Sequence, residues 1–250
     1  MRLTKNQRLD WSRDGFLRIE SFFNIEEIKN LLDCVEAIES CGTVDAIHHY
    51  EKTHDGIKPS RTENFIHDHE GFQKLFTTGK ILDAVSELFG EKAVLYKEKL
   101  NYKYPGGGAY IAHQDAPAYD YVKYHITCLV AVDQANQRNG CLQFASGLHE
   151  KGLIGLDSNG CIQESIAQKL EWKPVPLDPG DILLFSSYTP HKSDGNKTTD
   201  RRRIVYLTYN ALSAGDFRQQ YYATKIDAIQ SKSTGKISKI GHFQGKTVNR

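Results

Sequence analysis

The chain has 250 residues and carries 32 Lys and Arg against 31 Asp and Glu, which leaves a formal net charge of +1. A balance this even gives no basic field that would attract nucleic acid and no acidic excess of the kind found in disordered chains. We therefore expect no nucleic-acid partner, and any charged site must be local. No segment is apolar over the length that a signal peptide or a membrane helix needs, and the five cysteines lack metal-binding spacing. These features predict a cytoplasmic protein with reduced thiols and no membrane association.

The first third of the chain has the pattern of helices. Asn24 precedes a run with acidic residues in its first turn, as a helix N-cap does, and glycines stand where three of the helical segments end. We expect helices over residues 4–15 and 24–42, and one or two more over residues 70–90.

From residue 93 onward the pattern changes to short runs rich in β-branched and aromatic residues, separated by turns such as YPGGG and LDPGD. The expected strands cover residues 93–104, 124–133, 140–146, 181–187 and 203–211. Helices followed by strands predict an α+β chain whose β part is a sandwich or barrel with helices against one side.

No linker or repeat divides the chain, so we expect a single domain over residues 1–250. Within it the pattern predicts a helix-rich part (1–92), a β core (93–212) and a C-terminal tail (213–250). The tail ends in a Lys-rich stretch that we expect to be solvated, although packing as a cap is the alternative.

A histidine and an aspartate stand two residues apart in the stretch YIAHQDAPAY. In extended backbone the side chains of His113 and Asp115 project from the same face and can reach one point. His191, at the end of a strand that runs into a proline turn, is the best candidate for a third ligand. Two histidines and one carboxylate form a facial set that leaves positions open on iron(II). For the His-x-Asp pair alone, surface or hydrogen-bonded residues remain the alternative.

An arginine eleven residues beyond His191 strengthens the metal hypothesis. Arg202 lies where a loop returns into the next strand, and its planar guanidinium suits the far carboxylate of a dicarboxylate ligand. Arg201 and Arg203 fall on the opposite strand face by alternation, and we expect them to be solvated charges.

Three motifs together resemble the phytanoyl-CoA dioxygenase family of iron(II)- and 2-oxoglutarate-dependent oxygenases, which includes ectoine hydroxylases. They are AHQDAPAY, NGCLQFASGLH and PHKSDGNKT with the arginines that follow, and the segment DGFLRIESFFN is similar to the family's opening strand. The resemblance implies a double-stranded β-helix, the cupin-like jelly roll, with N-terminal helices buttressing it. A departure from the family pattern, Ala145-Ser146 in place of a proline, affects only a loop.

The resemblance implies an enzyme that uses iron(II), 2-oxoglutarate and dioxygen. His113, Asp115 and His191 would bind iron. The residues that would contact 2-oxoglutarate are Arg202, Ser193, Thr127, Asn101 and Lys97, although ordinary strand packing is an equal explanation for Thr127 and Asn101. Because the family's halogenating members lack the carboxylate that Asp115 supplies, we expect hydroxylation.

The substrate is expected to be a small anion. Lys97, Lys99, Asn101 and Lys103 share one strand face by alternation, and lysines on an inward face are costly unless they meet an anion. Arg61 lies in a segment that covers the site mouth in the family. The alternatives are that Lys103 lies past the barrel rim and that Arg61 pairs with Glu63 or Asp68.

The chain most resembles the branch that contains 2-aminoethylphosphonate hydroxylases. This implies C1 hydroxylation of 2-aminoethylphosphonate or a related organophosphonate, with Arg61, Lys99, Gln114 and Tyr119 at the substrate. The alternatives are hydroxylation of another small metabolite or an acyl-CoA, and a jelly-roll binding module without catalysis. The oligomeric state is not assigned. Three further histidines, His125, His149 and His242, are expected to be structural or exposed.

Overall fold

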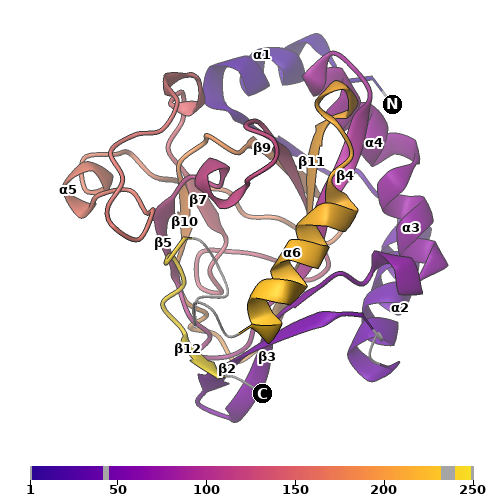
Figure 1. Ribbon diagram of the computed structural model, residues 1–250, viewed down its shortest axis with the longest axis vertical. Coiled ribbons are helices and arrows are strands. Elements are labelled where there is room, and N and C mark those ends of the chain that lie inside the picture. The colour runs from indigo at the N-terminus through magenta and orange to yellow at the C-terminus, as the bar shows by residue number, and fades with distance from the viewer. Residues whose placement is uncertain (1, 42–44, 232–239, 249–250) are drawn as a thin grey trace.

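The computed structural model describes residues 2–41, 45–231 and 240–248 (Figure 1). Its helices are α1 (Lys5–Asp14), α2 (Ile25–Cys41), α3 (Glu70–Thr77), α4 (Gly79–Phe89), α5 (Glu164–Ala167) and α6 (Arg218–Gln230). Its strands are β1 (Phe16–Ile19), β2 (Ile47–Thr53), β3 (Gly56–Glu63), β4 (Ala93–Lys103), β5 (Tyr110–His113), β6 (Ile126–Ala131), β7 (Leu142–Phe144), β8 (Lys173–Pro174), β9 (Ile182–Ser186), β10 (His191–Ser193), β11 (Arg202–Ala211) and β12 (Lys246–Val248).

The strands form two antiparallel sheets. The large sheet has the order β1-β9-β6-β11-β4-β3-β2-β12, and the small sheet has the order β5-β10-β7-β8. The long pair β4 and β11 forms the middle of the large sheet, with Arg202 opposite Lys103 at one end and Ala211 opposite Ala93 at the other. Two facing sheets with helices against one of them are the expected jelly roll with buttressing helices.

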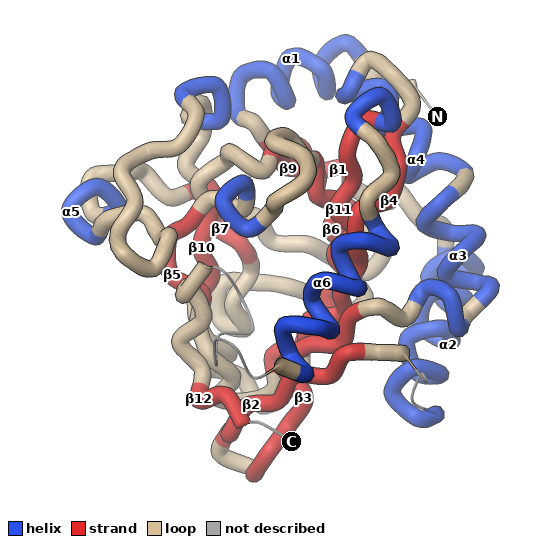
Figure 2. Tube along the Cα trace, in the orientation of Figure 1, coloured by secondary structure: helices blue, strands red, loops and turns tan. Residues whose placement is uncertain are grey.

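Two apolar cores hold this arrangement. Helices α2, α3 and α4 cover the outer face of the large sheet (Figure 2), where Leu31, Phe72, Phe76 and Val205 belong to one buried cluster. A second cluster between the two sheets includes the stacked pair Phe16 and Phe144, whose ring centroids are 4.6 Å apart. The inner face of the large sheet is apolar around Phe16 and polar where it faces β5 and β10.

The helix ends follow the sequence signals. Thr4 and Gln7 form a capping box at the start of α1, and Asn24 accepts from the backbone N–H of Glu27 at 2.9 Å at the start of α2. Helices α1 and α4 end at Gly15 and Gly90, which take left-handed conformations with φ of 79° and 73°. The expected end of α2 at residue 42 lies outside the described residues.

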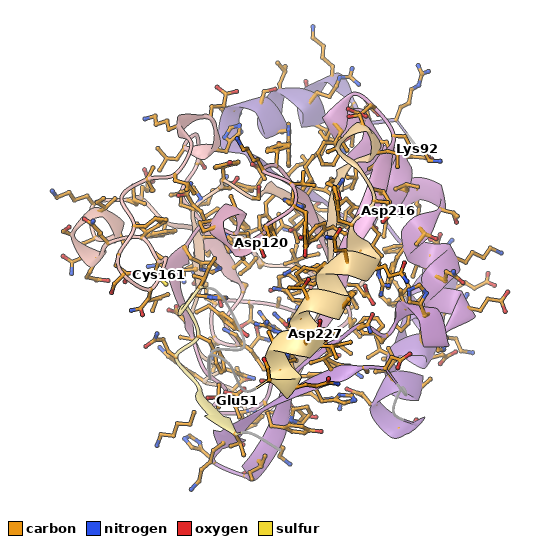
Figure 3. All side chains as sticks on the ribbon, in the orientation of Figure 1. Glu51, Lys92, Asp120, Cys161, Asp216 and Asp227 are labelled. Atoms are coloured by element: carbon orange, nitrogen blue, oxygen red, sulfur yellow. The ribbon has the colours of Figure 1, made fainter. Side chains whose placement is uncertain are left out.

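Two of the expected chain regions differ from the structure. The part expected to be helix-rich, residues 1–92, also supplies β1, β2 and β3 to the large sheet. The C-terminal tail contains α6 and ends in β12, which pairs with β2 beside Glu51 (Figure 3). The expectation of a solvated end is therefore wrong for residues 240–248. Of the helices described, none is both long and apolar enough to span a membrane.

Candidate functional site

The three residues expected to bind metal meet at one point between the sheets. His113 ends β5 and His191 begins β10, and these residues are paired across the small sheet. The Nε2 atoms of His113 and His191 lie 3.7 and 3.9 Å from Oδ1 of Asp115, and the possible ligand atoms of all three lie within 4.8 Å of one another. Both histidines are 4 % exposed. This is the spacing of a two-histidine, one-carboxylate facial site for iron(II).

Backbone carbonyls orient both imidazoles. Nδ1 of His113 donates to the carbonyl of Ile111 at 2.7 Å, and Nδ1 of His191 donates to that of Thr189 at 2.9 Å. Each Nε2 is therefore left as the acceptor that a metal ligand requires. Burial alone would raise the pKa of the Asp115 carboxyl, but the neighbouring His191 and Lys99 hold this pKa well below its usual range, so Asp115 is a carboxylate.

A buried cationic site lies at the end of the large sheet that carries Arg202. Arg202 is 1 % exposed, its Nη1 donates to the carbonyl of Gly140 at 2.6 Å, and its Nε is buried without a partner. Lys103, 2 % exposed, donates to the Oγ of Ser193 at 2.9 Å. A guanidinium with an unused N–H, an ammonium and a hydroxyl at one place are the donors that a carboxylate would satisfy. We call Arg202, Lys103 and Ser193 the distal anion site.

Gly140 allows the distal anion site to form. Its φ of +79° favours glycine, and a Cβ at this position would collide with the carbonyl oxygen of Asp194 and lie 2.9 Å from Nζ of Lys103. Lys103 also donates to that Asp194 carbonyl. The NGCL motif thus places a backbone close to both cations.

The structure places Lys97, which was expected at 2-oxoglutarate, away from the distal anion site, and its role there stays a prediction. Lys97 shares the inward face of β4 with Lys103 but lies six residues away, about 20 Å along an extended strand. Its strand partner is Thr208, whereas the partner of Lys103 is Arg202. Lys103 lies beside Arg202. The alternative that Lys103 lies past the barrel rim is therefore not what the structure shows.

The other two residues expected at 2-oxoglutarate face inward from the same sheet. Asn101 is 4 % exposed and its Oδ1 is buried without a partner. The hydroxyl of Thr127 lies 3.2 Å from that of Thr208, at the Lys97 end of the sheet. Their roles stay predictions, and only Asn101 lies near the distal anion site.

Two more cations lie near the metal residues, Lys99 four residues before Lys103 on β4 and Arg61 opposite Asn101 on β3. Lys99 extends over the Tyr206 ring at 4.6 Å, and burial lowers its pKa to about 7. Arg61, on β3, forms the anticipated ion pair with Glu63 at 3.2 Å. Glu63 is 1 % exposed at its side chain and also binds Lys225 at 2.6 Å, so a single carboxylate serves several cations. The positive charge here is in excess, which suits an anionic ligand.

Of the two remaining candidates, Tyr119 lies beside a lysine of β4 and Gln114 is bound to a loop. The Tyr119 ring is 8 % exposed and faces Nζ of Lys97. Gln114 follows the end of β5 at His113. Its side-chain amide donates to the carbonyls of Gly152 and Tyr188, and its Oε1 accepts from the backbone of Ile154. Gln114 therefore holds a loop, and its assignment to the substrate stays a prediction that these contacts do not support.

The C-terminal region supplies residues to the site that the sequence patterns missed. From α6, Tyr221 and Lys225 reach the inward side of β4. His242 lies against the ring of His113 with centroids 4.2 Å apart, and Nδ1 of His242 donates to the carbonyl of Ile240. No motif marks these positions. The only available signal was the return of aromatic residues after the last strand.

Of the three histidines expected to be structural or exposed, two lie close to the site. His242 packs on a metal residue, as above, and His125 is fully buried against Tyr119. Only His149, beside Gly15 at the end of α1, is away from it.

Solved structures with a similar fold include iron- and 2-oxoglutarate-associated proteins. EctD from S. alaskensis superposes with a TM-score of 0.73 at 20 % identity, covering 85 % of this chain and 78 % of that one. The epimerase SnoN, solved with iron(III) and α-ketoglutarate, gives a TM-score of 0.70 at 18 % identity and 83 % coverage of each chain. At these identities the likeness confirms the fold.

Two curated relatives are similar in sequence over nearly the whole chain. A methylphosphonate hydroxylase of Gimesia maris is 51 % identical and covers 99 % of this chain and 98 % of its own. A 2-aminoethylphosphonate dioxygenase of an uncultured bacterium is 38 % identical and covers 89 % of this chain and 87 % of its own. The family model described as Phytanoyl-CoA dioxygenase (PhyH) matches residues 11–204, a range that contains the metal triad and Arg202. With that range covering most of the chain, the protein belongs to the phytanoyl-CoA dioxygenase (PhyH) family.

Proposed function

We propose that the protein is an iron(II)- and 2-oxoglutarate-dependent dioxygenase that hydroxylates a small organophosphonate at the carbon bonded to phosphorus. The observation that carries this proposal is the number of buried cations near the metal residues. Arg202 and Lys103 lie with Ser193 in the distal anion site, and Lys99 and Arg61 add two further positive charges. A dicarboxylate cosubstrate and a second, anionic substrate would offset these charges.

The residues present fit iron(II). Two neutral imidazole nitrogens and an ionised carboxylate converge, and no thiolate takes part. Iron(II) bound there would supply the activation of dioxygen that is coupled to conversion of 2-oxoglutarate to succinate and carbon dioxide. The protein's own contribution is to hold His113 and His191 through fixed backbone partners and to keep Asp115 ionised beside them.

The residues also fit 2-oxoglutarate. Its distal carboxylate would accept from the unused Nε of Arg202 and from the Lys103 ammonium, with Ser193 beside them. These groups orient the cosubstrate so that its keto-acid end reaches the metal residues. An acyl-CoA substrate is not favoured, because Lys99 and Arg61, the cations outside the distal anion site, suit a small anion better than an acyl chain.

The phosphonate assignment is supported by Arg61 and Lys99 together with the two relatives, which are named for methylphosphonate and for 2-aminoethylphosphonate. A phosphonate has three oxygens that accept hydrogen bonds and a charge that the two cations offset. Arg61 retains N–H groups beyond the one that binds Glu63, so it can serve both.

The test is succinate release from 2-oxoglutarate by iron-loaded protein, with phosphorus NMR of the organic product. Methylphosphonate or 2-aminoethylphosphonate should stimulate succinate release and yield a 1-hydroxyalkylphosphonate in equal amount. If neither compound raises succinate release above the substrate-free rate, the substrate proposal fails. If 2-oxoglutarate is not consumed at all, the dioxygenase proposal fails with it.

A further inference from the structure

Aromatic rings hold the ammonium group of Lys97. Its Nζ lies 4.7 Å from the ring centroid of Tyr119 and 5.5 Å from that of Tyr221, both within the range of a cation–π contact. The side chain is almost completely buried, and burial lowers the pKa of Lys97 to about 8. Of the nearby acids, Glu63 stabilises the charged form of Lys97 most. The Glu63 carboxylate is, however, already bound by two other cations, Arg61 and Lys225.

Two further rings form the back of this enclosure. The Tyr96 ring centroid lies 5.5 Å from that of Tyr119 and 5.0 Å from that of Tyr221. The His125 ring lies 4.2 Å from Tyr119, and burial lowers the pKa of His125 to about 3, so it is a neutral imidazole. We call these four rings the aromatic cage. Neutral ring faces around a cation are how proteins bind alkylammonium groups.

The cage lies near Lys99, a cation that would hold the substrate. Lys97 and Lys99 project from the same face of β4, and the charge of Asp115 acts on both lysines. The distal anion site is at the opposite end of that strand. A substrate held by Lys99 can therefore extend along β4 toward the cage, away from the distal anion site.

We propose that Lys97 selects the substrate: its ammonium occupies the aromatic cage that would otherwise receive the cationic group of an aminoalkylphosphonate. The site then accepts phosphonates whose short carbon chain carries no charge. This inference rests on the proposed function and replaces the expectation that 2-aminoethylphosphonate is the substrate. An amino group brought toward the cage meets the charges of Lys97, Lys99 and Arg61. Glu63 and Asp115, the acids whose charges act on both Lys97 and Lys99, are committed to cations and to the metal site.

The decisive variant is Lys97→Met, which keeps the length of the side chain and removes its charge. We compare kcat/KM for 2-aminoethylphosphonate and for methylphosphonate, each measured by succinate release and by hydroxylated product. The wild type should prefer methylphosphonate, and Lys97→Met should raise the ratio in favour of 2-aminoethylphosphonate at least tenfold. Lys97→Arg should keep the wild-type ratio because it restores a cation in the cage.

The matched control is Lys99→Met, the same change on the same strand face two residues away. It removes a cation but leaves the cage filled, so both phosphonates should lose affinity and their ratio should stay within threefold of wild type. If Lys97→Met also leaves the ratio within threefold, or if the wild type prefers 2-aminoethylphosphonate, the selection role is wrong while the phosphonate function stands.

A binding measurement separates this inference from the function itself. Lys97→Ala empties the cage, and calorimetry with the metal- and 2-oxoglutarate-loaded protein should detect propylammonium binding that the wild type lacks. If neither phosphonate is a substrate, the proposed function fails, and this titration still decides whether Lys97 fills an ammonium site. Absence of propylammonium binding to folded Lys97→Ala would overturn the cage assignment.

Discussion

Replacing Arg202 with lysine should weaken 2-oxoglutarate specifically. The guanidinium is buried, its Nη1 is committed to Gly140 at 2.6 Å, and its Nε has no partner among the residues that the structure describes. A carboxylate can therefore take Nε and Nη2 together, whereas a single lysine Nζ cannot serve both carboxylate oxygens and the Gly140 carbonyl. Losing one charge-assisted hydrogen bond costs about 1.5–3 kcal/mol, which corresponds to roughly 10- to 150-fold in affinity. Lys103 remains in place, so binding should be weakened and not abolished.

The assay is an equilibrium titration of 2-oxoglutarate into metal-loaded protein without dioxygen, because KM need not equal a dissociation constant. Arg201→Lys is the matched control, since Arg201 is a neighbour whose partly exposed side chain contacts Glu39. Phosphonate affinity, measured at saturating 2-oxoglutarate, should change little in either variant. A change of less than threefold for Arg202→Lys, or an equal loss for Arg201→Lys, would refute the assignment of Arg202 to the distal carboxylate.

Further consequences can be measured in the same way. Alanine at any of the three metal residues should remove stoichiometric iron(II) binding and activity while thermal unfolding remains cooperative; a variant that retains normal turnover would take its residue out of the ligand set. Arg61→Ala should weaken the phosphonate by about 1.5–3 kcal/mol without stopping substrate-free 2-oxoglutarate turnover, and unchanged phosphonate affinity would contradict its role. Burial, with Arg61 and a second lysine nearby, lowers the pKa of Lys99 to about 7, so the Lys99 ammonium is lost as pH rises through that value. Phosphonate affinity should then fall by up to about tenfold per pH unit above it. Lys99→Arg should flatten this fall, and a parallel decline in both proteins would refute the explanation. Arg218→Ala leaves buried Glu98 without its ion pair at 2.7 Å and should lower the free energy of unfolding in urea by about 3–5 kcal/mol. Arg13 is exposed, and Arg13→Ala should lower the free energy of unfolding by less than about 1 kcal/mol. Similar losses in the two variants would contradict the difference in burial.

The metal triad and its arginine could be predicted because their signals are short and local. Alternation in an extended chain predicted that His113 and Asp115 reach one point. They do so although β5 ends at His113 and Asp115 has helical backbone angles. His191 stands where a strand begins after a proline turn. The same rule predicted the inward face of β4, and the structure confirms that Lys97, Lys99 and Lys103 share it. What alternation cannot give is position along the barrel, and this is why Lys97 was assigned to the end that Lys103 occupies.

The remaining errors arise from packing that no local pattern records. Arg203 was expected to be solvated because it alternates with Arg202, but it is 5 % exposed and binds Asp133 and Glu39. The outer face of the large sheet is covered by helices, so facing away from the barrel does not mean facing solvent. The polar composition of the C-terminal region likewise concealed its return to the sheet through β12.

The C-terminal region also makes the cations inside the site costly until an anion binds. Buried lysines are costly because desolvation opposes their charge, which is why the pKa values of Lys97 and Lys99 are lowered to about 8 and 7. The cover over them comes from α6, through Tyr221, and from the segment that carries His242 against the metal residues. Exclusion of water makes the buried positive charges costly while no anion is bound. Once an anion binds, the same exclusion of water strengthens each contact between the cations and that anion. The C-terminal region is therefore part of the binding site, and the cost of its buried charges is offset when cosubstrate and phosphonate neutralise them.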